Sequence, residues 1–248
     1  MKILEDVYLV GSGQFAISAA LDCHVYLIRA GTEYILIDAG AGKFESDSDL
    51  LVRNIRDEGI KTDSNFSLFL THAHSDHAGG GKFLKKKLNC TIYANKITAD
   101  FVSRGRENEL GLDFAKRSGF YGDDYRFHTY RVDKIIKDGE TIVFGNLKIR
   151  CLLVPGHSTD SMCYLVEKDG KKILFTGDVV NHGGKIILLN CYGFSLKDYR
   201  ENIKKLSGLS VDMFFPGHGV FSLENGQSHV DILVNAFDRL LINGVLVL

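Results

Sequence analysis

The pattern of apolar and polar positions in the first part of the chain indicates short β-strands. Apolar runs at 7–10, 24–29 and 34–40 read VYLV, HVYLIR and YILIDAG, and each is bounded by glycine or polar residues. Runs of this length with turn residues at their ends are typical of strands and hairpins. The runs SLFLT at 67–71 and TIYA at 91–94 predict two more strands.

Two segments in the same part of the chain have the apolar spacing of amphipathic helices. From 48 to 58, Leu51, Val52 and Ile55 fall on one helix face, and a glycine follows as a stop signal. A second helix is predicted at about 79–88.

Positions 96–130 break the strand pattern. This segment is polar and favours helix, and it becomes aromatic-rich towards FYGDDYRF. We expect it to be an inserted helical cap or lid within a single domain that spans 1–248, rather than a separate domain.

Strand-like runs return after the insertion, and two further helices are expected at about 196–206 and 227–243. Strand-like and helix-like segments therefore occur twice in a similar order, which favours two ββ…α halves in one core, with helices outside two sheets. The later strand-like runs lie at 140–144, 147–154, 162–168, 171–176 and 212–216.

Composition and charge exclude some partners. Hydrophobic residues make up 45% and charged residues 25% of the chain, as in ordinary globular proteins. The 30 basic and 31 acidic residues give a formal net charge of −1, so no general attraction to nucleic acid or anionic membranes is expected.

The sequence also indicates a cytoplasmic protein without a membrane partner. No apolar run approaches the roughly 18 residues of a membrane span. Glu5 and Asp6 stand where a signal peptide would carry its apolar stretch. The five cysteines are odd in number and form no close CxxC pair, which is typical of buried thiols in a reducing compartment.

The residues that directly follow four of the apolar runs carry the chemical information. Each of these strands is followed at its first turn by side chains that can bind a metal, in the motifs HAHSDH, PGH, TGD and PGH. Loops at the ends of buried strands are where functional groups usually lie. The side chains placed in this way are His72, His74, Asp76, His77, His157, Asp178 and His218.

Both prolines of the chain occur in the same tripeptide, Pro-Gly-His, which ends at His157 and again at His218. Proline has no backbone N–H and suits a strand end, and glycine permits the sharp turn that follows. The repeated tripeptide therefore indicates that two strands each deliver one histidine to the edge of a sheet.

This set of donors matches two divalent metal ions. Neutral imidazoles and carboxylates suit Zn²⁺, and they also suit iron or manganese. Seven side chains are enough for two sites with room for water. Because Asp76 and His77 adjoin, they can face a second ion while His72 and His74 face the first.

The motifs THAHSDH, PGHS, FTGD and PGHG, with LIDAG before them, occur in the order of the metallo-β-lactamase superfamily, and the chain resembles that family over most of its length. The resemblance implies an α/β fold, an αββα four-layer sandwich with the metal site at one edge of two sheets, here with a helical insertion.

The resemblance also divides the ligands between two metal ions and adds one supporting residue. Asp38, in LIDAG, matches a family aspartate that supports the metal loop from behind the ligands. The implied ligands are His72, His74 and His157 for metal one, Asp76, His77 and His218 for metal two, and Asp178 as a bridge.

Such a centre implies a binuclear metal-dependent hydrolase. Two close cations give a bridging hydroxide at neutral pH, and Asp76 and Asp178, the expected catalytic residues, position it and move its proton. Within the superfamily, the chain most resembles the glyoxalase II-like group, whose members hydrolyse thioesters. That group has a tyrosine soon after the last histidine, whereas Gly219 and Val220 follow His218 here. We therefore expect a thioester or carboxylic ester of an acyl carrier other than glutathione.

Three alternatives stay open at this stage. A lactonase would use the same centre, and so would a phosphodiesterase or nuclease. The lysines of KFLKKKL fit the solvated face of a helix, so a nucleic-acid partner is not expected. A sulfur dioxygenase would instead use one iron held by His72, His157 and Asp178.

Further residues are candidates for contact with the substrate. Asn181, His182 and Lys185 closely follow Asp178 and are expected at the mouth of a pocket. Tyr121, Tyr125 and Phe127 in the insertion are candidates for a lid, with core packing as the alternative. The sequence leaves open whether the protein forms a homo-oligomer.

Overall fold

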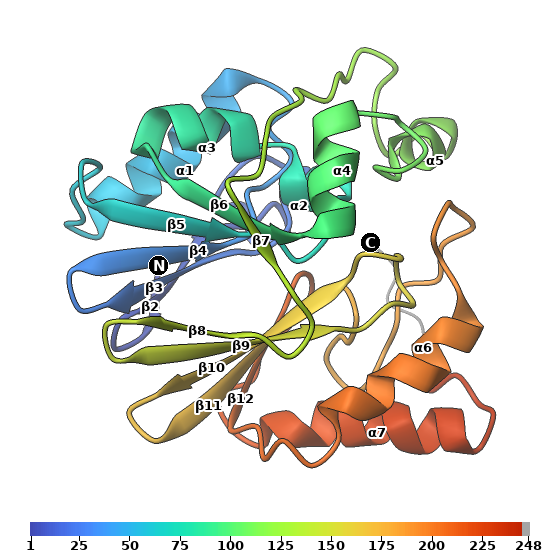
Figure 1. The fold of residues 1–248 in the computed structure, drawn as a ribbon. Coiled ribbons are helices and arrows are strands. Elements are labelled where there is room, and N and C mark those ends of the chain that lie inside the picture. The colour runs from blue at the N-terminus through green and yellow to red at the C-terminus, as the bar shows by residue number, and fades with distance from the viewer. Residues whose placement is uncertain (245–248) are drawn as a thin grey trace. The chain divides into compact units, whose positions relative to one another are not determined.

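The apolar runs predicted as strands all form strands in the computed structural model, which describes residues 1–244. The structure divides into two units, one of Met1–Ile136 and one that begins at Lys137. Each unit contains one sheet (Figure 1). No helix among the described residues is long and apolar enough to cross a membrane.

The first unit contains a seven-stranded sheet whose spatial order follows the chain. Neighbouring strands are antiparallel from β1 to β4 and parallel from β4 to β7. The two edge strands, β1 and β7, were not predicted, because three residues are too few to show a pattern. The strands are β1 (Lys2–Leu4), β2 (Val7–Gly11), β3 (Val25–Ala30), β4 (Glu33–Ile37), β5 (Asn65–Phe69), β6 (Thr91–Asn95) and β7 (Lys134–Ile136).

Helices pack against one face of this sheet (Figure 1). Val25 and Leu27 of β3 share a core cluster with Leu51 and Ile55, because alternate residues of a strand point to the same face. The helices of the first unit are α1 (Glu45–Asp57), α2 (Ser75–Ala78), α3 (Gly81–Leu88), α4 (Lys96–Arg104) and α5 (Leu112–Arg117).

Two of these helices differ from the prediction. Helix α1 begins before position 48, since the Asp47 carboxylate accepts the Phe44 N–H and caps the first turn. The helix predicted at about 79–88 is α3, which begins at Gly81, and the short helix α2, which carries Asp76 and His77, was not predicted.

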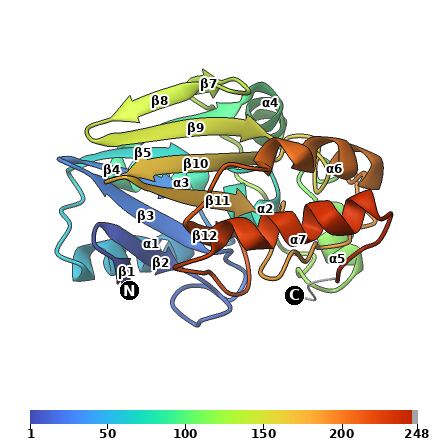
Figure 2. The same cartoon turned by 90° about the horizontal axis from the view of Figure 1, so that it is seen from below.

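The second unit contains a five-stranded sheet with helices on one face (Figure 2). Helix α6 (Leu196–Asn202) ends in a 3₁₀ turn, η1 (Ile203–Leu206), and α7 (Gly226–Asp238) ends before the predicted boundary at 243. In spatial order the strands are β12 (Met213–Pro216), β11 (Lys171–Gly177), β10 (Met162–Lys168), β9 (Leu147–Leu153) and β8 (Thr141–Phe144).

The segment 96–130 contains α4, α5 and an irregular stretch, and it belongs to the first unit. Tyr121 and Tyr125 lie in the core of this unit, with Phe127 partly buried against it, so these rings have the packing role that was the alternative to a lid. A movement of the segment as a whole stays a prediction.

Candidate metal centre

Two parallel strands place the first group of predicted site residues at one sheet edge. Ile37 of β4 pairs with Phe69 of β5, so the residues after both strands emerge side by side. The Asp38 N–H donates to the Phe69 carbonyl at 2.9 Å, and the Thr71 N–H donates to Asp38 Oδ1 at 2.8 Å. Asp38 has a φ of +65°, a conformation that Asp adopts more readily than most residues.

Asp38 accepts three hydrogen bonds in a position that is 1% exposed. Besides the Thr71 N–H, it receives the Thr71 hydroxyl at 2.8 Å and His77 Nδ1 at 2.8 Å, both on Oδ2. The Thr71 oxygen in turn lies 3.0 Å from His72 Nδ1. Since the Thr71 hydrogen is committed to Asp38, His72 must donate its Nδ1–H to Thr71.

This network sets the tautomer of two histidines. When Nδ1 carries the proton in His72 and His77, the lone pair of each ring is on Nε2, the atom that can bind a metal. One carboxylate thus orients two rings, one directly and one through Thr71. The support predicted from Asp38 has a physical basis here, and its effect on a metal stays a prediction.

Asp76 and His77 form one pair of converging donor atoms. Asp76 Oδ2 lies 3.4 Å from His77 Nε2, too far for a strong hydrogen bond. Two donors about 2.1 Å from a tetrahedral Zn²⁺ are themselves separated by about 3.4 Å. The observed separation therefore fits two ligands of one ion. The side chain of Asp76 is 15% exposed and that of His77 is fully buried.

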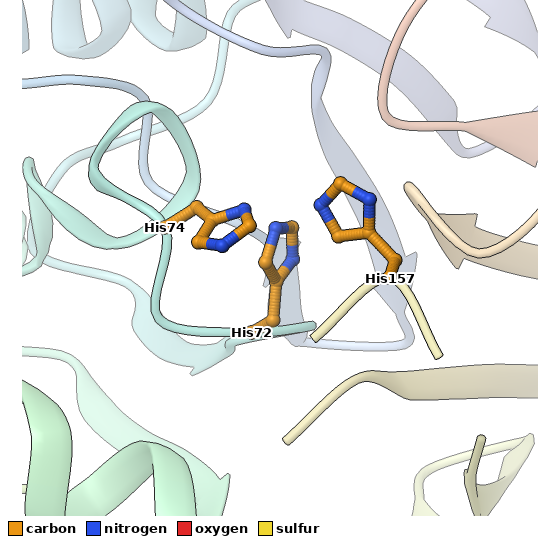
Figure 3. Close-up of side chains that lie close together, drawn as sticks. All are labelled: His72, His74 and His157. Carbon is orange, nitrogen blue, oxygen red and sulfur yellow. The ribbon is translucent and has the colours of Figure 1, made fainter. Parts of the chain in front are cut away.

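His72 and His74 form a second pair in the first unit. Their ring centroids lie 4.6 Å apart in an edge-to-face arrangement (Figure 3). Ser75 anchors the loop behind them, since its N–H donates to the Leu110 carbonyl at 3.1 Å. A Cβ built on Gly111 would lie 2.9 Å from His74 Cδ2, so glycine is required where the insertion packs against this ring.

The second unit brings its three predicted ligands together. Strands β11 and β12 are parallel, and the Gly217 N–H donates to the Gly177 carbonyl at 2.7 Å, which places the turns of Asp178 and His218 side by side. Asp178 Oδ2 lies 3.5 Å from His157 Nε2 and 3.6 Å from His218 Nε2. Both separations fit ligands that share an ion, and the bridging role of Asp178 stays a prediction.

A close contact explains why glycine precedes His157. A Cβ on Gly156 would lie 2.4 Å from Cγ of the Tyr199 ring. Tyr199 is buried on α6, and its hydroxyl donates to the carbonyls of Asp178, at 3.1 Å, and Val179, at 2.6 Å. The same tyrosine therefore contacts the turn of His157 and the turn of Asp178.

The predicted substrate contacts have different surroundings. Asn181 is 1% exposed, and neither of its amide atoms has a hydrogen-bond partner within the part of the chain that the structure describes. The Asn181 N–H donates to the Lys185 carbonyl, which makes a tight turn. His182 and Lys185 are exposed, and the His182 ring lies 4.5 Å from that of His229 on α7. Contact of these residues with a substrate stays a prediction.

Sequence reasoning missed two members of the first unit's site. Thr71 was taken only as the end of a strand, although it links Asp38 to His72. Cys23 was taken as a core thiol, yet its sulfur belongs with Asp38 and His77 to a group whose potential ligand atoms lie within 4.8 Å of one another. Burial raises the pKa of the Cys23 thiol far above its usual value.

Three of the four lysines of α3 pair with neighbouring carboxylates. Lys85 pairs with Asp133 at 2.5 Å and Lys86 pairs with Glu45 at 3.1 Å. Lys87 contacts Glu45 and Asp49. A face in which the positive charges are already paired offers little to a phosphate backbone.

Known proteins resemble the chain over most of its length. The family model described as the metallo-beta-lactamase superfamily matches residues 19–218. The atrochrysone carboxyl ACP thioesterase of Aspergillus fumigatus is 26% identical over 208 residues, 84% of this chain and 53% of that protein. The thioesterase pkgB of Emericella nidulans is 27% identical over 79% of this chain and 45% of its own length. The chain spans about half the length of these curated relatives.

Solved structures agree on the fold. A metallo-β-lactamase of Cronobacter sakazakii with an HARLDQ motif has a TM-score of 0.74 at 24% identity, covering 97% of this chain and 93% of its own. A subclass B3 metallo-β-lactamase of Bradyrhizobium japonicum has a TM-score of 0.71 at 20% identity, covering 97% and 92%. At these identities the likeness concerns the fold, and it confirms the α/β class of the metallo-β-lactamase type that the motifs predict.

Proposed function

Because the chain belongs to the metallo-β-lactamase superfamily, we propose that it is a thioester hydrolase that uses two divalent metal ions, Zn²⁺ in the first instance. Membership of this family, with thioesterases among the named relatives, classes the chain as a hydrolase. The observation that carries the proposal is the position of Asp178 Oδ2, 3.5 and 3.6 Å from the Nε2 atoms of His157 and His218.

The donors of both units fit the proposed ions. The side chains drawn in Figure 3, His72, His74 and His157, are three imidazoles that suit a first Zn²⁺. Asp76, His77 and His218 suit a second ion, with Asp178 shared. Neither unit has enough ligands for two ions by itself, so we propose that both contribute to one binuclear centre.

The chain's own residues orient the reaction. Two divalent cations, when bound, supply a water of lowered pKa and polarise the acyl carbonyl. Asp38 and Thr71 hold the rings of His72 and His77 with Nε2 as the donor atom. Asp76, whose carboxylate is partly exposed, is placed to take the proton of the attacking water and pass it to solvent.

A thioester is the substrate class that the relatives favour. Both curated relatives described above are named as thioesterases, one of them as an atrochrysone carboxyl ACP thioesterase. Because the chain covers only about half of these proteins, the substrate of the whole protein is part of the proposal. A small acyl thioester is the form in which we propose to test it.

The test is a comparison of purified wild-type protein with the Asp178→Asn variant. Acyl thioesters, lactones and bis(p-nitrophenyl) phosphate are offered as substrates, and bound metal is measured in parallel. We expect thioester hydrolysis with two metal ions per chain. We expect a loss of about 100-fold or more in kcat/KM for Asp178→Asn, since residues that only support the ligands of a metal already contribute about 10- to 100-fold.

A matched control is the Asp169→Asn variant in the β10–β11 turn of the same unit. Asp169 is exposed and pairs with Lys168, so its replacement should leave activity unchanged. Full activity of Asp178→Asn would contradict the bridging role. If lactones or the phosphodiester were hydrolysed faster than thioesters, the proposed substrate class would be wrong. One iron per chain together with oxygen consumption would identify a sulfur dioxygenase in place of a hydrolase.

The compartment and partners of the protein are part of the same proposal. Four of its cysteines are buried thiols without disulfides, namely Cys23, Cys90, Cys151 and Cys163, and this supports a reducing, cytoplasmic location. The paired lysines of α3 support a small-molecule substrate over a nucleic acid.

A further inference from the structure

The helix that carries Asp76 and His77 is very short. Helix α2 contains four residues, Ser75–Ala78. A single helical turn is not stable by itself, because nucleation fixes several residues for one hydrogen bond. The position of Asp76 and His77 therefore depends on contacts that α2 makes with the rest of the first unit.

Two buried tyrosines from the insertion supply such contacts. The Tyr130 hydroxyl donates to the carbonyl of Ala78, the residue directly after His77, at 2.7 Å. The Tyr125 hydroxyl donates to the Ala41 carbonyl at 2.5 Å. Ala41 lies in the loop after Asp38. The loop behind the ligands and the end of α2 are thus each held by one phenol.

The glycine run that ends the metal motif is shaped to receive these tyrosines. A Cβ on Gly79 would lie 2.5 Å from the Tyr125 hydroxyl oxygen, and a Cβ on Gly81 would lie 2.5 Å from the Tyr130 ring. Gly80 faces the Ala39 carbonyl, at 2.1 Å from a built Cβ. Any side chain at these positions would displace a tyrosine or the loop after Asp38.

Segment 96–130 also contacts the first residue of α2, Ser75. The Leu110 carbonyl accepts the N–H of Ser75 at 3.1 Å and its hydroxyl at 3.3 Å. Tyr121 stacks on Tyr125 with ring centroids 4.9 Å apart and 15° between the planes. These contacts bury the aromatic part of the insertion in the core of the first unit.

We propose that Tyr125 and Tyr130 are positioning residues for the pair Asp76 and His77, and that segment 96–130 fixes α2 as a binding platform for a metal ion. The inference rests on the proposed metal centre, and it assigns a role to residues outside the ligand set. The two phenols act through backbone carbonyls, so they set where the two donor atoms lie and do not touch the ion.

The test measures metal affinity in the variants Tyr125→Phe and Tyr130→Phe of the full chain. Metal-free protein is titrated with Co²⁺ and with Zn²⁺ against a competing chelator, and binding is followed by calorimetry and by the visible absorption of Co²⁺. We expect one of the two binding steps, that of the ion held by Asp76 and His77, to lose about 10-fold in affinity, the lower end of the effect of residues that support ligands. The other step should change by less than about threefold.

Tyr8→Phe is the matched control, because Tyr8 of β2 is a buried tyrosine in the same core cluster. It should bind both ions as the wild type does. A purely structural role for Tyr125 and Tyr130 would lower the melting temperature of the metal-free protein and weaken both steps equally. That result, or unchanged affinities in both variants, would overturn the inference. A wild-type protein that binds no ion would instead overturn the proposed function.

Discussion

A single buried carboxylate organises the histidine-rich loop. Asp38 accepts the Thr71 N–H, the Thr71 hydroxyl and His77 Nδ1, and through Thr71 it also sets the ring of His72. Such a network is costly to break, since each donor left without its acceptor remains buried. Asp38 is therefore expected to matter for stability as well as for metal binding.

Replacing Asp38 by asparagine tests both roles. Asparagine tolerates the φ of +65°, but its amide NH₂ cannot accept the hydrogens of Thr71 and His77. We expect a loss of about 1–3 kcal/mol in the free energy of unfolding of the metal-free protein. Metal affinity should fall by about 10- to 100-fold. Denaturant unfolding and metal titration measure the two effects.

Asp6→Asn is the control for this substitution. Asp6 has a φ of +62° in the β1–β2 turn, so the same change is made in the same backbone conformation. It should change the free energy of unfolding by less than about 0.5 kcal/mol and leave metal affinity unchanged. If Asp38→Asn matched this control in both measurements, the network would have no energetic role.

Asp22 makes the stability of the first unit depend on pH. Burial raises the pKa of this carboxyl from 3.8 to about 6, although Ser18 and the Ala41 N–H favour its charged form. A raised pKa means that the folded state binds the proton more tightly than the unfolded state. The resulting stability is fully present below pH 3.8 and is lost as the pH rises through about 6.

The Asp22→Asn variant should remove this dependence. The measured quantity is the free energy of unfolding of the variant minus that of the wild type. We expect this difference to be roughly 2–3 kcal/mol larger above pH 7 than near pH 3.5, since one pKa unit corresponds to about 1.4 kcal/mol. Urea unfolding of metal-free protein at several pH values measures the difference between the two curves. A constant difference across this range would show that Asp22 keeps its ordinary pKa.

At the residue scale, spacing alone was enough to select the candidate ligands but not the residues that support them. The candidate ligands His72, His74 and His77 are recognisable in the sequence because three histidines within six residues are rare. Thr71 is an ordinary strand residue until β4 and β5 pair in parallel and bring Asp38 to it. Tyr125 lies 84 positions from Ala41, and no local pattern can predict a contact over that separation.

At the scale of elements, the end of strand β9 in the second unit depends on glycine for packing. Replacing Gly156 by alanine would drive a Cβ into the Tyr199 ring, at 2.4 Å in the present geometry. Either α6 or the turn that carries His157 must shift. We expect a loss of about 2–4 kcal/mol in the free energy of unfolding, from overpacking and backbone strain together, with reduced hydrolysis.

Gly170→Ala separates packing from backbone strain. Gly170 in the β10–β11 hairpin has a φ of +77°, and a Cβ there would meet nothing within 4 Å. Its replacement should cost only the strain of a left-handed alanine, about 1–2 kcal/mol. Equal losses for Gly156→Ala and Gly170→Ala, measured by denaturant unfolding, would mean that the Tyr199 contact is easily relieved.

The strands could be predicted better than the ends of the helices. Strand β9 alternates buried apolar residues with exposed basic ones, and β11 contains the buried run ILF, so both strands are evident from the sequence. The helix predicted at about 79–88 begins two residues later, at Gly81, because Gly79 and Gly80 form a turn that packs against other loops, which only the folded unit reveals. Helix α7 ends at Asp238 although the apolar residues continue to Ile242.

At the scale of the whole molecule, metal binding should stabilise the fold. An ion that binds only the native protein adds about 2.7 kcal/mol when its concentration is 100 times its dissociation constant. Removal of metal by a chelator is therefore expected to lower the unfolding midpoint, and addition of Zn²⁺ should restore it. The shift should be smaller in Asp178→Asn. An identical midpoint with and without metal in the wild type would contradict the proposed centre.

The division of the chain into consecutive units has a consequence for its biosynthesis. The first unit ends at Ile136 and already contains His72, His74, Asp76 and His77, whereas His218 is 82 positions further on. At about 5–20 residues per second, the ribosome needs roughly 4–16 s to cover that interval. A first unit that folds as soon as it is complete would therefore hold four of the seven proposed ligands in place for seconds before His218 has been translated.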